Sequence, residues 1–270
     1  MQKTILITGS TDGIGLLTAQ KLLDLGHKVL IHGRNSSKLE HSKQRLLESN
    51  KEGIIETYLA DLSNISEVKK LASDISKNNN KIDVLINNAG IYKTNDKVTK
   101  DGLDVRFVVN TIAPYLLTKA LMPLLHSSSR VVNLSSAAQA PVQEEALRGE
   151  ILLEDSHAYA QSKLALTMWS SYLAFKNEIE GLVMVAVNPK SFLGSKMVKD
   201  AYGAQGVDIN IGADILVRAS LSDEFSNANG KYFDNDIEQF ALPHLDATDI
   251  DKCKNIVLAI EEILKRDKIF

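Results

Sequence analysis

The stretch Thr8-Gly9-Ser10-Thr11-Asp12-Gly13-Ile14-Gly15 predicts how the whole 270-residue chain is built. An apolar, β-branched run at residues 3–7 precedes it, and residues 16–25 after it carry apolar side chains at helical spacing. This order predicts a strand, a glycine turn and a helix. Glycine lets the backbone approach a ligand closely, and the first N–H groups of the helix point at the turn. The stretch therefore indicates a dinucleotide site, although an isolated glycine triplet can also be an ordinary tight turn.

Apolar runs and amphipathic segments alternate along the rest of the chain. This alternation implies right-handed crossovers and a parallel sheet, and the lack of clean apolar–polar alternation within strands indicates burial on both faces. The sequence therefore predicts an α/β fold, a single doubly wound (Rossmann-type) domain over residues 1–270, with a central parallel sheet of about seven strands flanked by helices on both faces. We expect strands at residues 3–7, 29–32, 54–60, 82–86, 130–134, 181–187 and 230–233, and helices at residues 16–25, 36–48, 66–75, 103–125, 157–176, 209–220 and 249–265.

Composition and charge argue against several classes of protein. Apolar residues make up 44% of the chain, which is enough for one core and argues against disorder. The net charge of -3 comes from acids and bases mixed along the chain, so we expect no nucleic-acid partner. The six histidines form no ligand-like cluster with acids, so we assign no metal.

The sequence also carries expectations about the cellular compartment. Cys253 is the only cysteine, which excludes an internal disulfide and is compatible with a reducing compartment. Met1 leads directly into the first expected strand, so we expect no signal peptide. We find no apolar run that approaches the roughly 20 residues of a membrane helix, and we therefore expect a cytoplasmic protein without a membrane span.

Ligands of open parallel sheets bind beyond the carboxyl ends of the strands, so polar residues that directly follow strands are the candidates. Arg34 follows the second expected strand, where the adenosine ribose of a dinucleotide is expected. Its guanidinium offers a charged donor fork to a 2′-phosphate, whereas an acid there would favour NAD. We therefore favour NADP(H), with a solvated loop arginine as the alternative. Asp61 follows the third strand and is expected either to accept from the adenine amino group or to serve as a helix N-terminal carboxylate.

Tyr159 and Lys163 are candidates for proton transfer. They are four residues apart on an expected helix, so they face the same way. An ammonium beside a phenol favours the phenolate and lowers a pKa that starts near 10. The pair would be a general acid for carbonyl reduction or a base for alcohol oxidation. The alternative is a surface pair, because this spacing is common by chance.

Two further polar residues complete the candidate catalytic set. The Ser136 hydroxyl, at the end of the fifth strand, could donate to a substrate carbonyl, and Ser135 is its rival for this role. Asn110 is polar within an apolar helix and could hold a water that relays protons to Lys163. The alternatives are a hydroxyl that closes the strand end and a satisfied structural amide.

These motifs together resemble those of the short-form short-chain dehydrogenase/reductase family, nearest to its retinol-dehydrogenase-like members. The resemblance covers residues 3 to about 195, in family order and at family-like distances. It is carried by Thr8 to Gly15, Asn87-Asn88-Ala89-Gly90, Asn110, Asn133 to Ser136, Tyr159 to Lys163 and Asn188-Pro189.

The resemblance implies a role for each candidate. Tyr159 is implied as the catalytic acid/base, Lys163 as the residue that lowers its pKa and binds the nicotinamide ribose, Ser136 as the group that orients the carbonyl, and Asn110 as support for the proton relay. The cofactor-binding residues that we expect are Gly9, Ser10, Asp12, Gly13, Ile14, Gly15, Arg34, Asn35, Asp61, Leu62, Asn88, Ala89, Gly90, Tyr159, Lys163, Pro189 and Phe192.

The chain departs from the common family pattern at two places. Residues 143–155 form an acidic insert which, like Gly230-Lys231-Tyr232-Phe233, resembles that of the retinol-dehydrogenase-like members. The family's Pro-Gly after the sixth strand is Pro189-Lys190 here. The downstream threonine that usually contacts the carboxamide is not at its expected place, and Ser191 or Ser195 could substitute for it.

The sequence thus predicts hydride transfer between NADP(H) and a ketone, aldehyde or secondary alcohol, with an apolar small molecule as the substrate class. A non-catalytic NADP(H)-sensing module is an alternative, although such a protein need not keep Ser136, Tyr159 and Lys163. An epimerase or dehydratase with a retained cofactor is another, against which the short chain argues. The helices at residues 103–125 and 157–176 form dimer faces in many relatives, so a homodimer is also possible.

Overall fold

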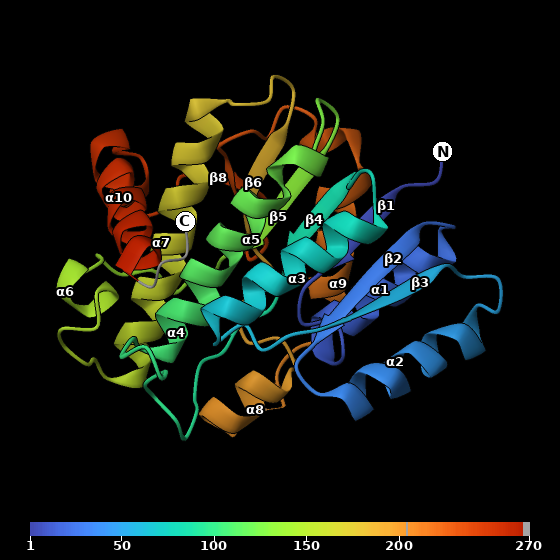
Figure 1. Ribbon diagram of the computed structural model, residues 1–270, viewed down its shortest axis with the longest axis horizontal. Helices are drawn as coiled ribbons and strands as arrows, with labels where there is room; N and C mark the ends of the chain where they lie inside the picture. Colours follow the sequence, from blue (N-terminus) through green and yellow to red (C-terminus); the bar gives the residue numbers. More distant parts are fainter. Residues whose placement is uncertain (204, 267–270) are drawn as a thin grey trace.

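The strand, glycine turn and helix predicted at the start of the chain are β1 (Thr4–Ile7), a turn at residues 8–12 and α1 (Gly13–Asp24). The computed structural model describes residues 1–203 and 205–266, and within these the strands form one eight-stranded sheet in the order β3-β2-β1-β4-β5-β6-β7-β8 (Figure 1). The other strands are β2 (Lys28–Gly33), β3 (Ile55–Leu59), β4 (Val84–Asn87), β5 (Arg130–Leu134), β6 (Val183–Asn188), β7 (Tyr232–Asp234) and β8 (Gln239–Ala241).

The sheet confirms the doubly wound fold. Strands β1 to β7 run parallel, and only β8 is antiparallel, paired with β7 at the edge. The sequence did not predict β8, because three residues are too few to show a period. The strand order reverses at β1, which pairs with both β2 and β4. In such sheets the ligand crevice lies at this reversal point.

Helices cover both faces of the sheet, as predicted (Figure 1). Side chains within one strand alternate between two cores: Leu6 of β1 belongs to one core, whereas Ile5 and Ile7 belong to the other. Both faces of each inner strand are therefore buried. The remaining helices are α2 (Ser36–Ser49), α3 (Ile65–Asn78), α4 (Val105–Phe107), α5 (Ala113–Leu121), α6 (Glu144–Leu147), α7 (Asp155–Lys176), α8 (Lys196–Tyr202), α9 (Asn210–Leu221) and α10 (Ile250–Arg266).

The long helix predicted at residues 103–125 is not one regular helix. It consists of α4, a π-helical turn at Val108–Ile112, α5 and a 3-10 turn at Met122–Leu124. Pro114 lies near the start of α5, just after the π turn, and its missing N–H leaves one carbonyl of the preceding turn without a helical donor. The π turn contains Asn110, and such turns are frequent at functional sites.

The same region corrects our statement that no apolar run approaches the length of a membrane helix. Val105–Leu124 is long and apolar enough to cross a membrane by length and composition alone. However, 72% of its most apolar window is buried inside the protein, where it packs against α3 and α7. Its hydropathy is therefore that of a core helix, and the apolar run is not obvious in the sequence because Arg106, Asn110 and Lys119 interrupt it.

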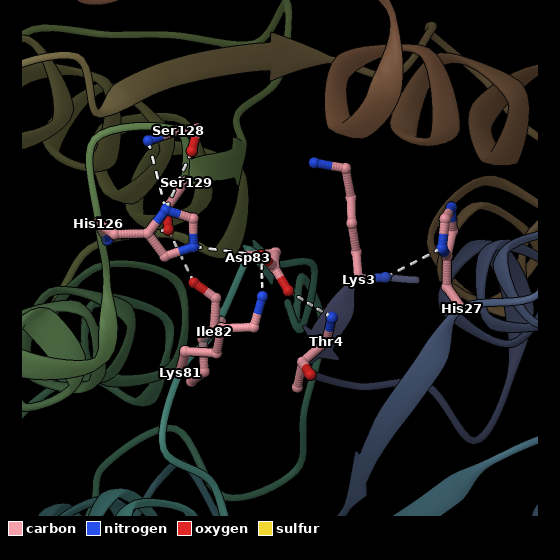
Figure 2. A network of polar contacts seen from close by, with 9 residues as sticks. All are labelled: Lys3, Thr4, His27, Lys81, Ile82, Asp83, His126, Ser128 and Ser129. Atoms are coloured by element: carbon pink, nitrogen blue, oxygen red, sulfur yellow. Dashed lines mark hydrogen bonds and ion pairs between the residues drawn. The ribbon is translucent and has the colours of Figure 1, made fainter. Parts of the chain in front are cut away.

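The amino-terminal edge of the sheet, opposite the expected crevice, is tied together by Asp83 (Figure 2). Its carboxylate accepts from the Thr4 N–H at 2.7 Å and from the Lys81 ammonium at 3.1 Å, and it lies 3.1 Å from the His126 ring. Burial raises the pKa of Asp83, but these donors lower it more, so the pKa lies below its ordinary value. This network joins β1 to β4 at the end away from the crevice, where it stabilises the sheet.

Candidate functional site

The glycine turn forms the floor of a cleft of ≈ 390 Å³ at the carboxyl edge of the sheet. Gly9 and Gly13 have φ angles of +65° and +56°, which L side chains rarely adopt. Gly15 permits a close approach instead: a Cβ there would lie 2.5 Å from both the Asn88 Nδ2 and the Gly9 carbonyl oxygen. Gly9 and Gly13 therefore serve the turn, and Gly15 serves its packing against Asn88.

Thr8 and Asn88 tie the turn to the end of β4. The Thr8 hydroxyl oxygen accepts from the Asn88 and Ala89 N–H groups, each at 3.0 Å. The Asn88 amide donates in return to the carbonyls of Thr8 and Gly9, at 2.8 and 3.0 Å. Asn88, Ala89 and Gly90 all line the cleft. Asn88 thus has a structural task in addition to any contact with a ligand.

His32 supports the glycine turn through a hydrogen bond, a role that was not predicted from the sequence. Its Nδ1 accepts from the Gly9 N–H at 3.1 Å, and its Nε2 lies 3.1 Å from the Ala60 carbonyl oxygen. Burial lowers the pKa of His32 to about 4. The ring is therefore neutral at pH 7, with its proton on Nε2 directed at Ala60. The position of His32 near the carboxyl end of β2 could have indicated this role.

Two cations mark one end of the cleft. Arg34 is exposed and lines the cleft, as expected, and Lys38 on α2 lines it as well. Lys38 was missed, although its spacing of four residues from Arg34 at a helix start was visible in the sequence. Asn35 does not line the cleft; its side chain caps α2 by accepting from the Lys38 N–H at 2.9 Å. This end of the cleft offers positive charge, and among the described residues no carboxylate forms an ion pair with Arg34.

Asp61 and Leu62 line the cleft beyond β3, where we expected them. The Asp61 carboxylate accepts from the N–H and the hydroxyl of Ser63, at 2.9 and 2.7 Å. These bonds close a turn ahead of α3, whose N-cap is Asn64, so Asp61 is not the helix cap that was the alternative. Ser10 is placed differently from expectation: its side chain is buried, donates to the Ile7 carbonyl at 2.9 Å and does not line the cleft. Its hydroxyl holds the turn together.

Tyr159 and Lys163 lie together on α7 at the other end of the cleft. Lys163 is 4% exposed, and its ammonium lies 5.8 Å from the centroid of the Tyr159 ring. The ammonium donates to the Leu134 carbonyl at 2.7 Å. Burial lowers the pKa of Lys163 to about 8. The pair is therefore not a surface pair, which was the alternative in the sequence.

Asn110 is completely buried behind this pair. Its amide accepts from the Ile91 N–H at 2.8 Å and donates to the Ile91 carbonyl and to the Ser162 hydroxyl, each at 2.9 Å. These are the bonds expected of a structural amide, the alternative stated above, and the relay role stays a prediction. Gly90 lies between the Asn110 amide and the Lys163 ammonium, since a Cβ there would be 3.4 Å from both the Asn110 Oδ1 and the Lys163 Nζ. Asn110 therefore joins the end of β4 to α7.

The two serines after β5 have different surroundings. Ser135 is buried, and its hydroxyl forms a 2.7 Å hydrogen bond with the Thr167 hydroxyl on α7. Ser136 is only partly buried, and its hydroxyl accepts from the Ala138 N–H at 3.1 Å, which leaves its own proton for another acceptor. Ser135 lines the cleft and Ser136 does not, so position favours Ser135, whereas the hydroxyl proton left for another acceptor favours Ser136.

The segment after β6 is strained where the family has glycine. Lys190 has a φ of +116° and Phe192 a φ of +53°. Pro189 lines the cleft, whereas Phe192 is exposed and does not. Ser191 is held away by Asp236, at 2.8 Å from its N–H and 2.5 Å from its hydroxyl. Ser195 begins α8 and lines the cleft, so it is the better placed substitute for the family threonine.

The structure thus brings most of the predicted residues to one cleft. It adds side chains that the sequence did not single out, because their positions depend on tertiary packing: Thr11, His32, Lys38, Ile91, Val109, Lys196 and Met197. It contains no group of three or more histidine, cysteine or acidic side chains that could hold a metal, within the described residues.

Comparison with known protein families agrees with the features of this site. These features are the cleft, the hydrogen bonds between the glycine turn and the end of β4, and the Tyr159–Lys163 pair. The family model described as short chain dehydrogenase matches residues 3–205. The chain belongs to the short-chain dehydrogenase family. Its sequence is similar to retinol dehydrogenase 13 of Mus musculus, with 26% identity over 267 residues that span 92% of this chain and 80% of the relative. The predicted likeness to retinol-dehydrogenase members is therefore confirmed.

Solved structures of this short-chain dehydrogenase fold superpose on the chain. A protein from Mycobacterium paratuberculosis is 24% identical, with a TM-score of 0.80, over 98% of this chain and 94% of its own. A short chain dehydrogenase from Shigella flexneri 2a, solved in complex with NADP, is 25% identical, with a TM-score of 0.68, over 86% of this chain and 96% of its own. The chain is accordingly an oxidoreductase of this family.

Proposed function

We propose that this chain is an NADP(H)-dependent oxidoreductase that interconverts an apolar ketone or aldehyde and the corresponding alcohol. One observation carries the proposal: a single cleft runs from the exposed cations Arg34 and Lys38, over the glycine turn, to Tyr159 and the buried Lys163. This order of charge, open backbone and proton-transfer groups is what a phosphorylated dinucleotide and a carbonyl substrate require.

The residues of the cleft fit the cofactor. Arg34 and Lys38 would hold the 2′-phosphate, and the helix start at Gly13 would hold the pyrophosphate. Asp61 and Leu62 would flank the adenine, and Lys163 would bind the nicotinamide ribose. The Shigella relative was solved with NADP, which supports this choice over NAD. The chemistry that the cofactor supplies when bound is hydride transfer to or from the substrate carbon.

The chain's own groups orient the substrate and move one proton. In reduction, Tyr159 would donate its phenolic proton to the carbonyl oxygen, and in oxidation it would take the alcohol proton back. The Lys163 ammonium would favour the phenolate that remains after the transfer. The Ser136 hydroxyl would donate to the same carbonyl oxygen and hold it near Tyr159. Asn110 would hold Ile91 and α7 in fixed relative positions behind these groups through its hydrogen bonds.

An apolar substrate is supported by the surroundings of Tyr159 and by the relatives. The Tyr92 ring lies 4.9 Å from the Tyr159 ring, and the aliphatic side chains of Ile91 and Val109 line the cleft. The mouse relative is named a retinol dehydrogenase, and retinol is an apolar alcohol. A rim of aromatic and aliphatic groups would bury such a substrate at a favourable free energy.

The test is oxidation of NADPH and NADH with a panel of carbonyl compounds that includes long apolar aldehydes, cyclic ketones and polar sugars. We expect turnover with NADPH and the highest kcat/KM among the apolar members. Tight NADPH binding without turnover on any member would instead support a sensing module. Equal kcat/KM with both cofactors would contradict the assignment of NADP(H).

A further inference from the structure

Tyr232 lies in the Gly230–Phe233 motif and has no part in the chemistry proposed above. It is the first residue of β7, and its side chain is buried, with the residue only 4% exposed. The phenol crosses from β7 to the end of β5, where its hydroxyl donates to the Ser136 carbonyl oxygen at 3.1 Å. The motif therefore reaches a residue of the proposed active site through the main chain.

Gln139 supplies a second donor to the same oxygen. Its Nε2 lies 2.9 Å from the Ser136 carbonyl oxygen, and its Oε1 accepts from the His244 N–H at 3.2 Å. A carbonyl oxygen has two lone pairs, so these two donors satisfy it completely. The amide of Gln139 is itself oriented by the His244 bond, which fixes which end faces Ser136.

The donors Tyr232 and Gln139 thus both hold the carbonyl group of Ser136, the residue whose hydroxyl is proposed to contact the substrate. Its neighbour Ser135 is anchored to α7 through Thr167, so the main chain is also fixed on the amino side. Ser136 lies beyond the last residue of β5, where no ladder hydrogen bond would otherwise hold it. The two donors fix the turn that follows Ser136, and the Ser136 hydroxyl belongs to this turn because it accepts from the Ala138 N–H at 3.1 Å.

We infer that Tyr232 and Gln139 are positioning residues, which hold the Ser136 main chain so that its hydroxyl meets the substrate carbonyl. This inference rests on the proposed function. A misplacement of about 1 Å in such a group can cost about 100-fold in rate. Burial raises the pKa of the Tyr232 phenol, so it remains a donor across the working pH range.

Tyr232→Phe tests the inference, because it removes the hydroxyl and keeps the ring. We expect kcat to fall about 10- to 100-fold, with the Kd for NADPH, measured by fluorescence titration, unchanged within twofold. Tyr115→Phe is the matched control: Tyr115 is also buried, its hydroxyl donates to Glu261 of α10 at 2.8 Å, and neither residue lines the cleft. This control loses a comparable hydrogen bond and should keep the unmutated kcat.

Gln139→Met provides an independent variant, since it keeps a similar stem and removes the donor. We expect it to lower kcat in the same way, and the double variant with Tyr232→Phe to lose less than the product of the two single effects, because both act on one oxygen. If Tyr232→Phe and Tyr115→Phe kept equal kcat while Tyr159→Phe lost it, the positioning role would be overturned and the proposed function would stand. An unmutated protein without turnover on the panel would overturn both.

Discussion

The Lys163 ammonium lies 2.7 Å from the Leu134 carbonyl oxygen, and this carbonyl is the hydrogen-bond acceptor it has in place of a carboxylate. Among the described residues, no acidic side chain forms an ion pair with Lys163. A buried ammonium without an opposite charge costs stability, which is why burial lowers its pKa to about 8. The role proposed for Lys163 and the stability of the fold therefore oppose each other at this residue.

Lys163→Met is expected to stabilise the fold at pH 7, by up to about 3 kcal/mol, because it removes a buried charge and keeps an apolar stem. The pKa of Lys163 is lower in the folded than in the unfolded state, so the cost is complete below pH 8 and is relieved as pH rises towards 10.5. The gain over the unmutated protein should thus shrink above pH 8. Urea unfolding at pH 7 and pH 9.5 measures it, and a variant less stable than the unmutated protein at pH 7 would refute the argument. Lys119→Met, at an ion pair on the surface, is the control and should change stability little.

Tyr159→Phe is expected to remove most turnover and to leave NADPH binding nearly intact, since the ring is retained and the transferable proton is lost. The loss expected from one acid–base group is about 10²- to 10⁴-fold in kcat. Steady-state kinetics and cofactor titration together check it. A variant with more than half of the unmutated rate would place the acid elsewhere.

The pH profile of alcohol oxidation checks the coupling between Tyr159 and Lys163. We expect the unmutated rate to rise with pH through an ionisation well below the roughly 10 of free tyrosine, and Lys163→Met to move that ionisation upward. Lys163→Arg should restore the profile only in part, because a guanidinium is larger than an ammonium. Identical profiles for all three proteins would show that the two side chains are not coupled.

Arg34→Asp is expected to weaken NADPH binding by about 2 kcal/mol or more, because a charge-assisted bond is replaced by repulsion. NADH binding should change little. Lys38→Glu should act in the same direction, since it lines the same end of the cleft. Arg45→Asp, on the exposed side of α2 and outside the cleft, is the control for net charge. Titration of both cofactors decides the matter: if Arg34→Asp and Arg45→Asp lost equal affinity for NADPH, Arg34 would not be the phosphate ligand.

His32 is expected to make stability depend on pH in the acid range. Its pKa falls from 6.5 to about 4 on folding, so the unfolded state binds more protons between these values and stability is lost as pH falls through them. The loss amounts to about 3 kcal/mol when complete. Asp83 and Asp236 also have lowered pKa values and contribute in the same direction at lower pH. The difference between the unmutated protein and His32→Asn, followed by urea unfolding from pH 7 to 4.5, isolates the histidine, and parallel curves would contradict its role.

Lys190→Gly is expected to stabilise the fold by about 1 kcal/mol, because glycine tolerates a φ of +116° and lysine does not. The variant also loses the 3.4 Å bond from the lysine ammonium to the Asn235 carbonyl, which limits the gain. The melting temperature measures it, with Lys231→Gly as a control at a nearby lysine without positive φ. A lower melting temperature for Lys190→Gly would show that the lysine contact outweighs the strain.

The sequence was sufficient to predict the elements that are long enough to show a clear apolar period and the turn whose residues are specific. The first strand, the glycine turn and α1 agree with prediction to within a few residues, and so does α7, which carries Tyr159 and Lys163. These segments form because local pattern and tertiary packing favour the same structure. The candidate residues after the strands mostly meet at one edge, since the carboxyl ends of parallel strands lie together.

Other features could not be derived from local pattern. The π turn around Asn110 depends on bonds to Ile91 and Ser162, which are distant in sequence. The burial of Ser10 and the capping role of Asn35 depend on neighbours that only the folded chain brings close. The helices α6 and α8 are short, and their positions are set by packing, so the pattern gave no signal for them.

The bond from Tyr232 to Ser136 also bears on how this protein can be recombined. The family match ends at residue 205, yet Tyr232 lies beyond it and supports a residue within it. A chimaera joined near residue 205 would keep the glycine turn, both cations and the Tyr159–Lys163 pair, and would take the support of Ser136 from its new C-terminal segment. Exchanging that segment between relatives would then change the turnover rate and leave the choice of cofactor unchanged.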